Sequence, residues 1–206
     1  MDEAAGSEIA IRINKEVAEN EIQELVGKGT FVGDPQWVPG VRGTALDFDG
    51  VGDGVLLGNS VSRYGSTDYT LSAWVRTTAD DGLIIQQRPK MEQGLDGQFN
   101  LEINEGRVRF WSYDGGYQFH FQSKDAINDG AWHHVVAQRE GREGRIYVDG
   151  KPSGSAEGPI AQLDPSFEMA IGYDLRDNNR YFKGAIDEVR VYSSIVAPDE
   201  IKGAEE

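Results

Sequence analysis

Two tight glycine turns near the middle of the chain constrain its fold more than any other feature. In the stretch FNLEINEGRVRFWSYDGGYQFHFQS, Glu105-Gly106 and Gly115-Gly116 each predict a two-residue hairpin loop. These loops link three antiparallel strands, which we predict at 98–104, 107–113 and 117–123. Because successive side chains of a strand point to opposite faces, the register set by such loops also decides which residues share a face.

Both turns give the same division of this three-stranded sheet into an apolar and a polar face. The predicted register places Leu101 opposite Phe110 and Phe110 opposite Phe121, so one face is apolar and belongs to a core. The other face carries polar and aromatic side chains that are free to meet a ligand or solvent. These residues are Asn100, Glu102, Arg109, Trp111, Tyr113, Gln118, His120 and Gln122.

The rest of the chain also favours strands over helices. From about Thr44 onward, short alternating segments are separated by Gly, Asp and Asn, and the chain holds 26 Gly in 206 residues. This spacing predicts an all-β, two-sheet antiparallel β-sandwich, with residues 1–206 forming a single domain. The expected core comprises Leu46, Phe48, Leu71, Ala73, Leu101, Ile103, Val108, Phe110, Phe119, Phe121, Val189 and Val191.

Two short surface helices are expected beside the strands. Ala18, Ile22 and Leu25 fall at helical spacing within Asn14–Gly27, which predicts a helical insertion ending near its glycine. The run Pro198–Ile201 predicts a one-turn helix, because proline suits the first turn.

Charge and composition exclude several classes of protein. The 20 basic and 35 acidic side chains give a net charge of −15, which argues against nucleic acid and against anionic membranes as partners. No apolar stretch is long enough to predict a transmembrane helix, so we expect no membrane insertion, and the sequence MDEAAGSEIAIR does not resemble a signal peptide. The absence of Cys excludes disulfides and thiolate metal sites.

Five sequence motifs follow one another in an order typical of a known family. They are GTALDFDG at 43–50, YTLSAWVRT at 69–77, DGAWHHVVAQREG at 129–141, IYVDGK at 146–151 and GAIDEVRVYSSIVAPDEI at 184–201. Together they resemble laminin G-like domains, the concanavalin A-like jelly rolls, from about Gly29 to the end of the chain. The resemblance implies the two-sheet sandwich, and we expect the aromatic-rich first strand usual in the family to be truncated or absent.

Because lectins, polysaccharide hydrolases and adhesive modules share this fold, the function has to be argued from a site. We interpret the chain as a non-catalytic, lectin-like module that binds a glycan or polysaccharide. The resemblance places it in a larger extracellular or cell-surface protein. Trp111 and Tyr113 would stack on sugar rings, and their polar neighbours would bind hydroxyls. A rim loop at Tyr173–Tyr181 is a second candidate site for the sugar.

The alternative is a structural or adhesive domain that binds protein and has no sugar site. In that case the sheet face is simply solvated, and a loop such as Arg88–Gly97 covers Trp111.

Catalysis has little support in the sequence. Retaining glycoside hydrolases need two neighbouring carboxyl groups, which jelly-roll glucanases present as Glu-x-Asp-x-x-Glu. The nearest run here, Glu102-Ile103-Asn104-Glu105, has an amide in the middle. His133 and His134 are adjacent on a strand and so face opposite ways, which prevents them from binding one metal together. We therefore predict that the chain is not an enzyme, and an uncharacterised polysaccharide hydrolase or lyase stays as a third interpretation.

A structural calcium ion is the one cofactor that we predict. Ca²⁺ prefers carboxylate and carbonyl oxygens, which this acidic chain supplies. The resemblance implies an ion held by Asp49 and Asp187, with a further ligand from the Asp2 region. In the alternative interpretation, Asp49 caps a turn and Asp187 pairs with an arginine such as Arg190.

Overall fold

A computed structural model describes most of the chain. The predicted helix at Asn14–Gly27 and the Asp2 region lie outside the described residues. The described ranges are 8–10, 29–58, 68–89, 97–113, 118–159, 163–164, 166–177, 179–192 and 194–203.

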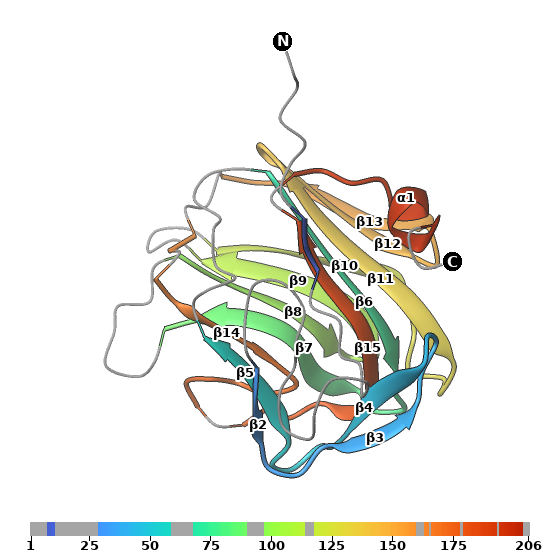
Figure 1. Cartoon of the computed structure of the whole chain (residues 1–206). Coiled ribbons are helices and arrows are strands. Elements are labelled where there is room, and N and C mark those ends of the chain that lie inside the picture. Colours follow the sequence, from blue (N-terminus) through green and yellow to red (C-terminus); the bar gives the residue numbers. More distant parts are fainter. Residues whose placement is uncertain are drawn as a thin grey trace.

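In this part of the chain, two antiparallel sheets face each other as a sandwich (Figure 1). The seven-stranded sheet has the order β10-β9-β8-β7-β14-β5-β2. The eight-stranded sheet has the order β13-β12-β11-β6-β15-β4-β3, and β1 pairs with β15. The strands are β1 (Glu8–Ala10), β2 (Thr30–Val32), β3 (Gln36–Pro39), β4 (Thr44–Asp49), β5 (Gly54–Gly58), β6 (Tyr69–Arg76), β7 (Asp81–Arg88), β8 (Gln98–Asn104), β9 (Arg107–Tyr113), β10 (Gln118–Ala126), β11 (Trp132–Glu140), β12 (Glu143–Val148), β13 (Lys151–Glu157), β14 (Glu168–Ile171) and β15 (Lys183–Tyr192).

The predicted one-turn helix is present as α1 (Pro198–Gly203), which lies outside the sandwich beside the eight-stranded sheet (Figure 1). Ile201 packs there with Val136 and Tyr192 in a small cluster separate from the main core. This helix is far too short to cross a membrane, and the described residues contain no helix able to do so.

The register of the central strands is the one that the sequence predicts. Leu101 pairs with Phe110 across β8 and β9, and Phe110 pairs with Phe121 across β9 and β10. At the first turn, Glu105 and Gly106 have φ values of 54° and 72°, the left-handed conformation that a tight hairpin of this type requires. Every residue of the predicted core is buried, with at most 7% of its surface exposed.

Some glycines that read as turn signals allow the two sheets to approach each other. The edge strand β10 contacts β13 of the opposite sheet, where the Lys124 amide donates to Ser153 Oγ at 3.2 Å. A Cβ on Gly154 would overlap the carbonyl oxygen of Gln122, and one on Gly144 would overlap the ring of Phe121. Residues without a side chain are therefore needed where the sandwich closes.

Candidate functional site

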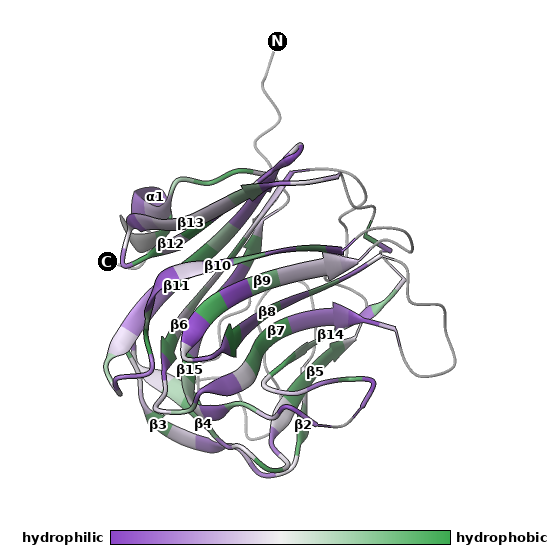
Figure 2. Ribbon diagram, turned by 180° about the vertical axis from the view of Figure 1, so that it is seen from behind, coloured by the Kyte–Doolittle hydropathy of each residue, from purple (hydrophilic) through white to green (hydrophobic). Residues whose placement is uncertain are grey.

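The outer face of the seven-stranded sheet brings the predicted polar and aromatic residues together. Figure 2 shows this sheet in the foreground, with hydrophilic and hydrophobic residues alternating along its strands. Asn100 pairs with Trp111, which pairs with His120, and Glu102 pairs with Arg109 in the next row. Side chains that are cross-strand neighbours share a face, so the eight predicted residues form one surface.

Exposure on this surface falls steadily from the edge strand towards the middle of the sheet. His120 and its β10 neighbours are exposed, and Trp111 and its β9 neighbours are half-buried. On β8, Asn100 is only 5% exposed and Glu102 is fully buried. Ligands can therefore reach the residues of β9 and β10, but they cannot reach Glu102 directly.

The loop from Tyr173 to Tyr181, which connects β14 to β15, is tied to the same face. The Leu175 amide donates to Gln86 Oε1 on β7 at 2.9 Å. Arg88 Nη1 pairs with Asp174 Oδ2 at 2.5 Å. The rings of Tyr173 and Tyr181 stack with their centroids 6.2 Å apart. The sheet face and the loop, which the sequence presents as two alternative sites, therefore adjoin each other.

Glu102 ends a chain of buried hydrogen bonds that runs between the loop and the sheet. Gln86 Nε2 donates to Asn100 Oδ1 at 3.0 Å, and Asn100 Nδ2 donates to Glu102 Oε2 at 3.4 Å. Two guanidinium groups also meet this carboxylate: Arg109 donates to Oε1, and Arg180 Nη2 lies 2.8 Å from Oε2. Glu102 therefore holds the two arginines in place, and Asn100 connects Glu102 to Gln86. The role of Asn100 and Glu102 as ligand contacts stays a prediction.

Trp111 and Tyr113 form a flat aromatic surface on β9. Their ring centroids lie 6.2 Å apart, and the ring planes differ by only 14°. Both side chains are half-buried, so each ring keeps part of its surface open to solvent. Arg109 lies on the same face of the strand, two residues before Trp111. This arrangement offers apolar ring faces beside a planar hydrogen-bond donor.

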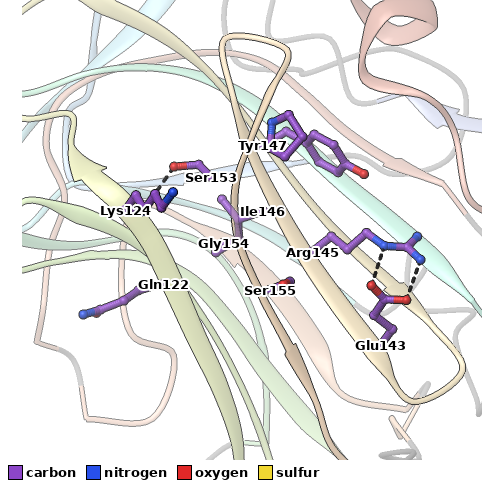
Figure 3. Close-up of a pocket in the computed structure, with 10 residues that line it drawn as sticks. Gln122, Lys124, Glu143, Arg145, Ile146, Tyr147, Ser153, Gly154 and Ser155 are labelled. Carbon is purple, nitrogen blue, oxygen red and sulfur yellow. Dashed lines mark hydrogen bonds and ion pairs between the residues drawn. The ribbon is translucent and has the colours of Figure 1, made fainter.

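A concavity of about 610 Å³ lies between β10 and the hairpin of β12 and β13 (Figure 3). Gln122 lines it, so it adjoins the sheet face at the edge strand. Arg145, which also lines this concavity, forms ion pairs with Glu143 at 2.6 Å and with Glu140 at 2.7 Å. Since two acids already neutralise this arginine, we consider the sheet face the stronger candidate.

The predicted calcium ligands do not converge in the structure. Lys183, not Asp187, is the β15 residue opposite Asp49. Asp187 lies four residues further along the strand, which corresponds to about 13 Å at the usual rise per residue. The described residues contain no cluster of three metal-ligating side chains. Asp49 and Asp187 therefore do not fit a single shared ion, and we derive no role for calcium from this pair.

Both carboxylates are instead bound to backbone amides. Asp49 Oδ1 accepts from Val51 at 2.7 Å and from Gly52, and these hydrogen bonds lower the pKa of Asp49. Asp187 Oδ2 accepts from Val41 at 2.8 Å in the turn between β3 and β4. Burial raises the pKa of Asp187, although its backbone hydrogen bonds oppose this. Asp49 thus caps a turn, as the alternative interpretation expected.

The two adjacent histidines face opposite ways, as the strand pattern predicts. His134 is buried, and its Nε2 lies 2.8 Å from Ser72 Oγ. His133 lies between two carboxylates, with Nδ1 2.9 Å from Asp149 and Nε2 3.2 Å from Asp129. Both ring nitrogens can donate only when the imidazole is charged. Burial lowers the pKa of His133, but hydrogen bonds and charge from the two carboxylates raise it by more, so it lies above its usual value.

His133 should therefore stabilise the fold in a pH-dependent way. A pKa that is higher in the folded than in the unfolded state gives a stabilisation that is complete below the unfolded pKa, about 6.5, and is lost as the pH rises through the folded pKa. Chemical unfolding of the wild type and His133→Gln measures this effect. The difference in unfolding free energy should be larger at about pH 5.5 than at about pH 8.5. Equal differences at both pH values would contradict this role.

Two antiparallel sheets that pack face to face in this way define a jelly-roll β-sandwich. The chain belongs to the laminin G-like family: the family model described as the concanavalin A-like lectin/glucanases superfamily matches residues 49–202. The resemblance inferred from the sequence motifs is thereby confirmed, as is the fold.

Relatives and solved structures agree with this assignment. Over 121 residues, or 57% of this chain, the sequence is 37% identical to the mouse basement membrane-specific heparan sulfate proteoglycan core protein, but it spans only 3% of that protein. Domain 4 of AbnA, an extracellular arabinanase from Geobacillus stearothermophilus, was solved with arabinotriose. It has a TM-score of 0.68 and 20% identity, with 88% of this chain and 89% of that chain covered. Domains LG4-5 of the mouse laminin α1 chain give 0.63 and 22%, covering 79% and 44%. At these identities, the structural matches show the fold alone.

Proposed function

We propose that this domain is a non-catalytic, lectin-like module of an extracellular protein and that it binds a glycan on the outer face of its seven-stranded sheet. The observation that carries the proposal is the stacked pair of Trp111 and Tyr113 beside Arg109. The arabinotriose complex of a similarly folded domain and the basement-membrane relative support the proposal.

The geometry suits a sugar for two physical reasons. Apolar C–H groups on one face of a sugar ring pack on aromatic rings, which give a large contact area at a small cost in conformational entropy. Hydroxyl groups can accept from the guanidinium of Arg109 and exchange hydrogen bonds with exposed Gln118, His120 and Gln122. Because these hydrogen bonds replace bonds to water, we expect a weak Kd, on the order of 10⁻⁵–10⁻³ M.

Substitution of Trp111 tests this proposal. Trp111→Ala should reduce glycan binding below detection and leave the melting temperature nearly unchanged, because the ring lies on the outer face. Trp132→Ala is a matched control: this half-buried tryptophan lies on the other sheet, where Arg76 stacks over it, so its loss should leave binding intact. A glycan array identifies the sugar, and isothermal titration calorimetry with thermal unfolding then measures both quantities.

The outcomes separate the candidate functions. A steep fall in melting temperature for Trp111→Ala would make the ring a structural element. Unchanged binding would move the site away from the sheet face. If no glycan binds the wild type, the alternative of a protein-binding adhesive domain gains support, because half-buried aromatic residues also anchor protein interfaces.

A further inference from the structure

We propose that Arg109 and Arg180 form a carboxylate-binding subsite, so that the domain prefers glycans carrying an isolated acidic sugar over their neutral counterparts. This inference rests on the proposed function and specifies the class of glycan. Two observations carry it: both arginines contact the buried carboxylate of Glu102, and other nitrogen atoms of their guanidinium groups are not used in that contact.

The two arginines come from distant parts of the chain and meet over one buried acid. Arg109 lies on β9, and Arg180 lies at the end of the loop between β14 and β15. Their side chains are 26% and 32% exposed, whereas Glu102 is fully buried. Each guanidinium therefore has one edge on Glu102 and keeps part of its surface towards solvent.

Several donors remain unused after the contacts with Glu102. Arg109 directs Nε and Nη2 to Oε1, and Arg180 directs Nη2 to Oε2. Among the described residues, Nη1 of Arg109 and both Nε and Nη1 of Arg180 have no protein partner. A guanidinium presents its donors in a planar fork, which matches the two oxygens of a carboxylate.

The local charge also favours an anion. Two guanidinium groups and one carboxylate leave one positive charge on the sheet face of a chain whose net charge is −15. The neighbouring Arg88 adds no positive charge, because it pairs with both Asp174 and Asp177 and this group of three therefore carries a net charge of −1. The positive excess is confined to Arg109 and Arg180. A single carboxylate would neutralise this excess, whereas a long polyanion would be repelled by the acidic remainder of the molecule.

The subsite is held in position before any ligand arrives. The carbonyl oxygen of Arg180 accepts from the Leu83 amide on β7 at 3.2 Å. Arg180 also has a φ of 54°, an unusual backbone conformation for a residue other than glycine. Such local strain persists where the surrounding contacts fix the backbone, and it is common at binding sites. Glu102 is itself held in place, because it is buried and hydrogen-bonded through Asn100 to Gln86. Its carboxylate therefore fixes the positions of both guanidinium groups.

Matched sugars test the preference directly. The glycan array should contain pairs that differ only in one carboxylate: sialyllactose with lactose, and oligosaccharides ending in glucuronate with the same oligosaccharides ending in glucose. Sulfated oligosaccharides without a carboxylate form a third set. We expect the best acidic ligand to bind about tenfold or more tightly than its neutral partner, since charge-assisted hydrogen bonds are roughly twice as strong as neutral ones.

Variants then assign the preference to the arginines. Arg180→Gln should reduce the acid preference to about twofold or less while keeping the weaker binding of the neutral sugar. Arg107→Gln, on the same face of β9, is the control and should keep the preference. Arg107 donates to the Ser123 carbonyl oxygen, and in the described part of the chain it does not pair with Glu102. Thermal unfolding confirms that each variant is folded.

Each outcome has a defined meaning. Equal or tighter binding of the neutral partner, or tightest binding of a sulfated sugar without a carboxylate, would overturn the subsite and leave the proposed glycan-binding function standing. An equal loss of acidic and neutral binding in Arg180→Gln would also overturn it. Absence of binding to every sugar would reject the subsite and the proposed function together.

Discussion

Phe110→Ala should destabilise the protein by about 3–5 kcal/mol, whereas Trp111→Ala, the next position on β9, should cost about 1 kcal/mol or less. The ring of Phe110 is 2% exposed and lies at the centre of an aromatic cluster in the core. Its centroid is 5.4 Å from that of Phe121 and 6.2 Å from that of Phe99. Removing it leaves a cavity that these rings cannot fill without moving.

The paired measurement tests the strand register more strictly than either variant alone. Leu101, opposite Phe110, should also be costly to truncate, by about 2–5 kcal/mol. Denaturant unfolding of the three variants gives the free energies. If Trp111→Ala were the costly substitution and Phe110→Ala the mild one, β9 would be shifted by one residue, and the proposed site would face the core.

The sequence was sufficient to predict this part of the fold because its determinants are local. A two-residue turn at Glu105-Gly106 fixes which residues of β8 and β9 are opposite, and alternation then separates Phe110 from Trp111. The same argument places the exposed residues of β10, including His120. Neither step needs information about the other sheet.

The deeper part of the site was not predictable, because it depends on contacts between distant segments. Nothing near Glu102 indicates that Arg180 will reach it across the sheet. The alternation pattern placed Glu102 correctly on the outer face, but it cannot show that a loop buries that face. The one available signal was the position of Glu102 directly opposite Arg109 in the predicted register.

The calcium prediction depended on motif similarity. Motifs alone do not show which residues of two paired strands lie opposite each other. Asp49 and Asp187 each lie in a recognisable motif at opposite ends of the chain. The pairing of β4 with β15 places Lys183 opposite Asp49 and leaves Asp187 at the β3–β4 turn. The sequence motifs suggested that Asp49 and Asp187 lie close together, whereas the strand pairing places them apart.

Glu188→Gln should destabilise the protein by about 3–5 kcal/mol, because it removes the charge that balances a buried arginine. Arg190 Nη2 lies 2.6 Å from Glu188 Oε2, and the two side chains are 2% and 5% exposed. The substitution preserves the size of the side chain. Glu188 has a φ of 46°, and glutamine has the same number of side-chain atoms, so the backbone strain at this position stays the same. The loss measured by denaturant unfolding is therefore electrostatic.

Two further variants show whether this cost comes from the unpaired charge. Glu157→Gln removes an acid paired with Arg142 at 3.3 Å, but those side chains are 73% and 62% exposed, so the unfolding midpoint should stay the same. Adding Arg190→Met to Glu188→Gln should restore part of the stability, because the buried arginine is then no longer left charged without its partner. If the double variant were less stable than Glu188→Gln alone, Arg190 would stabilise the fold through its other contacts, such as its hydrogen bond with Tyr192, and not through the ion pair.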